Sequence, residues 1–132
     1  IDSDPNHCER AFVGNTIGQA NAVSDKLLDL RACNFDGKNL QAKTLSGALL
    51  SEKENPSSYV GANMQETVLS KAYAVDGVFK KADFSNAVID RVDFQGSDLS
   101  DALFRNAVIT GTTFDKADLT GADFEEALIG SE

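Results

Sequence analysis

Residues 82 to 129 read ADFSN AVIDR VDFQG SDLSD ALFRN AVITG TTFDK ADLTG ADFEE ALI, and this stretch decides the fold. Within it every fifth residue, from Phe84 to Ile129, is a large apolar side chain, and the residue two places earlier is small. The rule extends back to Tyr59, with Ala74 as the one small residue at a central position. Such regularity predicts one repeating architecture for this part of the chain.

A period of five fits neither the 3.6-residue period of a helix nor the two-residue period of a flat strand. We therefore expect the chain to bend by about a right angle at each repeat, so that the central residue and the small residue both point inward. Four sides would close a square coil of about twenty residues, and coils would stack at a spacing of roughly 4.8 Å.

A twenty-residue repeat is visible in the sequence. The segment Asn86-Ala87-Val88-Ile89 recurs as Asn106-Ala107-Val108-Ile109 and, more loosely, as Glu126-Ala127-Leu128-Ile129. Central residues twenty apart should form columns inside the stack of coils. The expected columns are Met64, Phe84, Phe104 and Phe124; Leu69, Ile89, Ile109 and Ile129; Ala74, Phe94 and Phe114; and Tyr59, Phe79, Leu99 and Leu119.

The repeats also resemble a known family. The segments Ala82-Asp83-Phe84-Ser85-Asn86, Ala117-Asp118-Leu119-Thr120-Gly121 and Ala122-Asp123-Phe124-Glu125-Glu126 match the A-(D/N)-(L/F)-x-x signature of pentapeptide repeat proteins. This resemblance implies a right-handed quadrilateral β-helix. We therefore expect a mainly β solenoid of about five coils with a short α-helical N-terminal cap.

The chain divides into a predicted helical cap over residues 1–27 and a predicted β-helix over residues 28–132, forming one structural domain. Asp4 before Pro5 is typical of a helix N-terminus, Gly14 could end that helix, and Ser24 could begin a second short one. Between Leu50 and Tyr59 the spacing is nine residues instead of ten, so we expect an irregular corner over residues 51–56.

The two cysteines lie in the N-terminal quarter. Cys33 occupies a small-residue position that points into the first coil, and Cys8 lies in the segment expected to cover that coil. A Cys8–Cys33 disulfide would contribute about 3 kcal/mol by restricting the unfolded chain. Two separate buried thiols are the alternative.

Residues that could support catalysis or bind a cofactor are scarce. His7 is the single histidine, no nucleophile, phosphate-loop, dinucleotide or calcium-loop motif accompanies it, and a surface or cap-packing role fits it better. A zinc site built on two cysteines and one histidine would need a carboxylate as its fourth ligand. The sequence therefore predicts a protein without catalytic residues, cofactor or metal.

Charge offers one functional lead, because the formal net charge is −9. Some pentapeptide repeat proteins are acidic rods that mimic DNA, and Asp98 and Asp118 would stack one coil apart here. Lys80, Lys81 and Arg91 interrupt the acidic surface, however, and solvation alone accounts for most of the acids. Direct binding of nucleic acid is not predicted, since it requires a basic patch.

An outward apolar column offers a second lead. The position just before each central residue should face water, yet on one side it is aliphatic on successive coils. The residues of this predicted ridge are Leu49, Val68, Val88, Val108 and Leu128. They could bind a partner protein, or they could reflect the preference of β-branched residues for extended backbone.

We expect a non-enzymatic scaffold or adaptor that binds an as yet unidentified protein, with an acidic DNA-mimic inhibitor of an enzyme such as gyrase as the alternative. End-to-end self-association through the C-terminal coil is a further expectation. The chain begins at Ile1, shows no leader segment and contains no run of 18 apolar residues, so we expect a processed protein that does not insert into a membrane.

The whole chain is also similar to the pentapeptide repeat proteins of the plant thylakoid lumen. The similarity rests on residues 12–21, on Cys8 and Cys33, and on Leu28-Asp29-Leu30-Arg31-Ala32-Cys33-Asn34-Phe35. It implies a soluble protein of the chloroplast thylakoid lumen.

Overall fold

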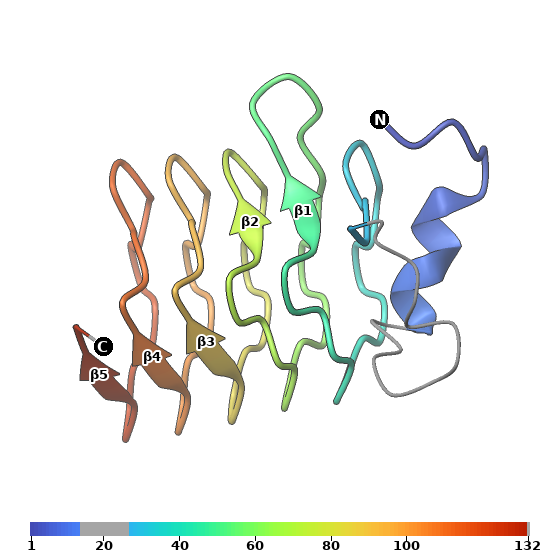
Figure 1. Ribbon diagram of the computed structural model, residues 1–132. Helices are drawn as coiled ribbons and strands as arrows, with labels where there is room; N and C mark the ends of the chain where they lie inside the picture. Colours follow the sequence, from blue (N-terminus) through green and yellow to red (C-terminus); the bar gives the residue numbers. More distant parts are fainter. Residues whose placement is uncertain (14–26, 132) are drawn as a thin grey trace.

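The computed structural model describes residues 1–13 and 27–131, and it shows a chain wound into stacked coils (Figure 1). Neighbouring coils pair through parallel bridges between residues twenty apart, such as Val78 with Asp98. The longer pairings form two parallel sheets, one of β1 and β2 and one of β3, β4 and β5. The elements are the 3₁₀-helix η1 (His7–Phe12), β1 (Leu49–Ser51), β2 (Tyr73–Ala74), β3 (Val88–Asp90), β4 (Val108–Thr110) and β5 (Leu128–Gly130).

Each coil has four sides, because four bridges follow one another along the chain at intervals of five residues. One such series comprises Ser58 with Val78, Asn63 with Asp83, Val68 with Val88, and Tyr73 with Asp93. The corners between sides contain residues with positive φ, such as Gly121 at 73° and Lys116 at 60°. Glycine adopts this conformation without steric cost, whereas lysine adopts it only at a steric cost. Packing of the sides therefore imposes the corner angle even where the sequence supplies no glycine.

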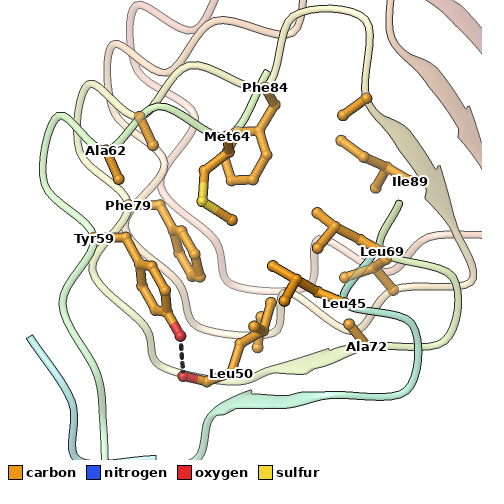
Figure 2. Packing of buried hydrophobic residues seen from close by; sticks show 14 of the residues in the cluster. Leu45, Leu50, Tyr59, Ala62, Met64, Leu69, Ala72, Phe79, Phe84 and Ile89 are labelled. Carbon is orange, nitrogen blue, oxygen red and sulfur yellow. Dashed lines mark hydrogen bonds between the residues drawn. The ribbon is translucent and has the colours of Figure 1, made fainter. Parts of the chain in front are cut away.

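The inward side chains form the predicted columns, and Figure 2 shows them converging on the interior from different sides. Phe104 lies parallel to Phe84, with ring centroids 5.1 Å apart, and parallel to Phe124 at 4.8 Å. Tyr59 stacks on Phe79 at 4.5 Å and is fully buried. Its hydroxyl donates a hydrogen bond to the carbonyl oxygen of Leu50 at 2.7 Å, as Figure 2 shows. The prediction of stacked columns is thus confirmed.

The residue two places before each central residue is small because the interior of the coil has no room for a larger side chain there. Gly77 is the sharpest case: a Cβ at this position would lie 2.5 Å from Cε2 of Phe79 and 3.1 Å from Cβ of Ser51. Contacts this short would force the ring or the backbone to move. The requirement at Gly77 is therefore one of space, in contrast to the conformational requirement at the corners.

The predicted irregular corner after β1 is present, but it spans a different number of sides from the expected one. Asn34 pairs with Ser58 and Leu49 pairs with Tyr73, so this coil needs 24 residues where the next needs twenty. The nine-residue step from Leu50 to Tyr59 therefore takes the place of one side, which normally has five residues. It does not take the place of two sides with ten residues in total. The additional residues form a projecting corner closed by an antiparallel bridge between Glu52 and Asn55, seen after β1 in Figure 1.

The N-terminal segment lies beside the first coil (Figure 1). Its helix, η1, is a 3₁₀-helix preceded by Asn6, and not the predicted α-helix beginning at Asp4 and Pro5. Asp4 instead closes the turn before η1, where its side chain accepts a hydrogen bond from the backbone N–H of Asn6 at 2.8 Å. Phe12 packs edge-on against Phe35 of the first coil, with centroids 6.1 Å apart. The predicted end of this helix at Gly14 and the predicted start of a second helix at Ser24 lie outside the described residues.

Candidate functional site

The exposed aliphatic column predicted from the sequence lies on the sheet of β3, β4 and β5. Val88 pairs with Val108 and Val108 with Leu128 in parallel register, and Val68 joins them through a bridge to Val88. Val88, Val108 and Leu128 are 37%, 38% and 69% exposed, and Val68 is half-buried. We call these four residues the aliphatic ridge.

Leu49 does not belong to this ridge, which corrects the prediction. The residue that pairs with Val68 on the preceding coil is Thr44, whereas Leu49 in β1 pairs with Tyr73 on the next side of the coil. The error has the same origin as the register error after Leu50. An insertion of four residues shifts every earlier column by one side.

The ridge lies on the three-residue strands β3, β4 and β5, and the chemistry at its position favours extended backbone there. On other sides this position is often aspartate, whose carboxylate accepts the backbone N–H two residues later, as Asp83 does from Ser85 at 2.9 Å and Asp118 from Thr120 at 3.0 Å. Those sides contain single bridges, whereas the valine side forms three-residue strands. β-Propensity therefore explains part of the pattern, but it does not require the side chains to remain exposed.

Tyr73 is an exposed residue that the sequence reasoning missed. It lies in β2 on the side next to the ridge, and it is 40% exposed. The available signal was an aromatic residue at a position where most repeats have a polar one. Asp98 pairs with Asp118 on the next coil, as predicted.

The N-terminal end contains the predicted bridge, since Cys8 and Cys33 form a disulfide. His7 lies beside it and is buried, with Nε2 at 2.8 Å from the carbonyl oxygen of Arg31 and Nδ1 at 3.2 Å from that of Asp4. Among the described residues, His7, Cys8 and Cys33 form a group whose possible ligand atoms all lie within 4.8 Å of one another. His7 therefore has the predicted packing role but in an unexpected chemical setting.

An ionic network fastens the same end to the first coil. Arg31 donates hydrogen bonds from Nε and Nη2 to the two carboxylate oxygens of Asp29 at 2.9 and 2.8 Å, and its Nη1 lies 3.0 Å from Glu52. Asp29 also accepts the backbone N–H of Asp2 at 2.9 Å. The Arg31 guanidinium holds the pKa of the Asp29 carboxyl far below its ordinary value of 3.8. The ion pair lies within the coil, and the N-terminal segment joins it through the backbone N–H of Asp2.

Replacing Asp29 with asparagine is expected to lower the free energy of unfolding by about 1.5–3 kcal/mol at pH 7, the range for hydrogen bonds to charged groups. Because the pKa of Asp29 is lower in the folded state, its contribution is fully present above about pH 4 and is lost as the pH falls below that value. The difference between the native protein and Asp29→Asn should therefore shrink between about pH 4 and pH 2. Denaturant titrations at each pH measure it, with exposed Asp115→Asn as control; a constant difference would contradict the assignment.

No helix in residues 1–13 or 27–131 is long and apolar enough to cross a membrane. Residues 62–101 and 88–126 match the family model described as pentapeptide repeats, in eight copies. Over 72 residues the chain is 52% identical to the thylakoid lumenal 17.4 kDa protein of Arabidopsis thaliana, which is chloroplastic. That alignment covers 53% of this chain and 29% of the relative. The relative's compartment confirms the predicted localisation in the thylakoid lumen.

Two solved structures share the fold. One is the pentapeptide repeat protein Rfr23 from the cyanobacterium Cyanothece 51142, at 17% identity and a TM-score of 0.50, with 76% of this chain and 86% of that chain covered. The other is QnrB1, a plasmid-mediated fluoroquinolone resistance protein, at 22% identity and a TM-score of 0.52, with 76% and 50% covered. At these identities the two matches show the fold alone, a β-helix of stacked repeats. Because residues 62–126 match the family model and form regular stacked coils, this part of the chain belongs to the pentapeptide repeat family.

Proposed function

We propose that this protein is a non-enzymatic scaffold or adaptor whose aliphatic ridge binds another protein. The observation that supports it most is the row of exposed aliphatic residues Val88, Val108 and Leu128, on a face where three strands lie in register. Contiguous exposed apolar residues on a β surface are typical of contact sites for other proteins.

The negative charge of this protein indicates which kind of partner surface would fit the ridge. The chain has a net charge of −9, and the exposed Glu125 and Glu126 lie at the corner next to Leu128. Complementary charge steers proteins together and selects among partners. The partner proposed here has an apolar strip bordered by lysine and arginine side chains.

The test is the double variant Val88→Asp with Val108→Asp. Aspartate at this repeat position is native at Asp83 and Asp118, so the fold should persist, while two charges would make the ridge unfit for an apolar partner. Pull-downs from a lumenal extract, under oxidising and reducing conditions, should recover a protein with native bait and lose it with the variant. Thr113→Asp, exposed at the same repeat position on the next side, is the matched control. Equal recovery by the native protein and the double variant would refute the ridge as the contact site.

The structural part of the proposal is a right-handed quadrilateral β-helix of about five coils, capped by residues 1–27 and continuing over residues 28–132. End-to-end self-association through the C-terminal coil is a second proposal, supported by Ile129, which is 65% exposed. Sedimentation analysis of the native protein beside Ile129→Asp tests it, and a concentration-independent monomer would exclude it.

An acidic DNA mimic that inhibits an enzyme such as gyrase remains the alternative. Its support is the net charge together with the stacked pair Asp98 and Asp118. Arg105 reduces this support, because its Nε lies 2.7 Å from the carboxylate of Asp123 and offsets an acid on that surface. Inhibition of gyrase supercoiling at micromolar protein would favour the mimic over the scaffold.

A further inference from the structure

We propose that, once the Cys8–Cys33 disulfide is reduced, this protein binds one zinc-type divalent metal ion through His7 Nε2, Cys8 Sγ and Cys33 Sγ. The carbonyl oxygen of Arg31 would be the fourth donor. Disulfide and metal use the same two sulfurs, so the bridged state and the metal-bound state exclude each other.

The distances between nitrogen and sulfur support this proposal. His7 Nε2 lies 3.3 Å from Cys33 Sγ and 3.6 Å from Cys8 Sγ. Tetrahedral zinc with bonds of about 2.3 Å to sulfur and about 2.0 Å to nitrogen would place such atoms roughly 3.5 Å apart. Two edges of a coordination tetrahedron are therefore already present, and only the two sulfurs need to separate.

A backbone oxygen would occupy the fourth coordination position of the ion, so the site does not need a carboxylate. The carbonyl oxygen of Arg31 lies 2.8 Å from His7 Nε2 and 3.4 Å from Cys33 Sγ. In the bridged state His7 Nε2–H can donate to this oxygen, whereas in the metal-bound state both atoms would face the ion. The sequence reasoning against a zinc site considered side-chain ligands only.

The other ring nitrogen of His7 is held as metal-binding histidines usually are. Nδ1 lies 3.2 Å from the carbonyl oxygen of Asp4, which can accept its proton and leave the lone pair of Nε2 free. A hydrogen bond of this kind fixes the tautomer and the direction of a ligating imidazole. His7 is 9% exposed and Cys33 5% exposed, so both ligands are shielded from bulk water.

The chemistry balances with a dithiol as reductant. Two electrons and two protons pass from the dithiol to the disulfide, which breaks the S–S bond, gives two thiols and leaves the reductant as a disulfide. The divalent ion then displaces both thiol protons, so two protons are released per ion bound. Two thiolates and one neutral imidazole give a site with no net charge, which suits a buried position.

The test begins with the whole chain reduced by a phosphine, which is then removed under oxygen-free conditions. Co²⁺ is added stepwise as a spectroscopic probe. We expect one Co²⁺ per chain, the intense visible bands of tetrahedral cobalt with thiolate-to-cobalt charge transfer, and displacement by Zn²⁺. The oxidised protein should bind none. Failure of the reduced protein to bind, or weak bands typical of octahedral cobalt, would overturn the proposal.

The role of His7 is tested with His7→Gln, which keeps both thiols and a donor that can reach Arg31. Its affinity for Co²⁺ should fall by more than the roughly 10–100-fold that loss of an outer-sphere partner costs. Glu9→Gln, which alters an exposed residue of the same helix, should bind as the native protein does. Equal affinity of His7→Gln and the native protein would overturn the site. Circular dichroism must show the β-structure of each reduced chain, since binding only to an unfolded chain would also refute the proposal.

Discussion

Replacing Phe104 with alanine is expected to lower the free energy of unfolding by about 3–5 kcal/mol, the usual cost of removing a large buried aromatic side chain. The ring is fully buried and lies between Phe84 and Phe124, with Phe114 edge-on at 6.3 Å. Its loss would leave a cavity between coils that the rigid backbone ladder cannot close. Urea denaturation followed by circular dichroism measures the change.

Phe124→Ala is the matched control for this prediction. Phe124 belongs to the same column and its ring stacks on that of Phe104, but Phe124 is only half-buried. Its replacement should therefore cost clearly less than that of Phe104. If the two variants lost equal stability, burial within the column would not be the source of the effect.

Replacing Cys8 and Cys33 together with serine is expected to cost about 3 kcal/mol, because the bridge closes a loop of 25 residues and restricts the unfolded chain. The effect should be local, since each coil contacts only its neighbours. Hydrogen exchange should accelerate for amides of residues 29–45 and remain unchanged for residues 98–123. Uniform acceleration along the chain would show that cap and coils unfold as one unit.

The same double variant separates the two roles of the sulfurs. If the proposed metal site exists, Zn²⁺ should slow exchange in the first coil of the reduced native protein and leave the serine variant unaffected. Protection of both proteins by Zn²⁺ would place the metal elsewhere.

The sequence predicted the interior of the coils well because a five-residue period records which side chains point inward. The period alone places Phe84, Phe104 and Phe124 in one column. The period could not, however, show how many sides the residues after Leu50 span. A spacing of nine fits both a shortened pair of sides and an enlarged corner, and only backbone pairing decides between them. Leu49 was assigned to the ridge for that reason.

The N-terminal site was harder to predict, because it depends on contacts between segments that lie far apart in sequence. The position of Cys33 indicated a bridge to Cys8 or two separate buried thiols, and it did not show where the side chain of His7 lies. The carbonyl of Arg31 had no signal in the sequence, since any residue supplies a backbone oxygen.

The enlarged corner after β1 shows that the solenoid can be extended sideways without disturbing its winding. Pairing returns to intervals of twenty residues immediately afterwards, as Ser58 with Val78 shows, and Lys53 and Glu54 at its tip are exposed. Peptide tags, fluorophores or recognition loops placed between these two residues should leave the later coils in register. The corner is thus a suitable insertion site for protein engineering. It also shows how one scaffold can acquire new peripheral features while its interior stays constant.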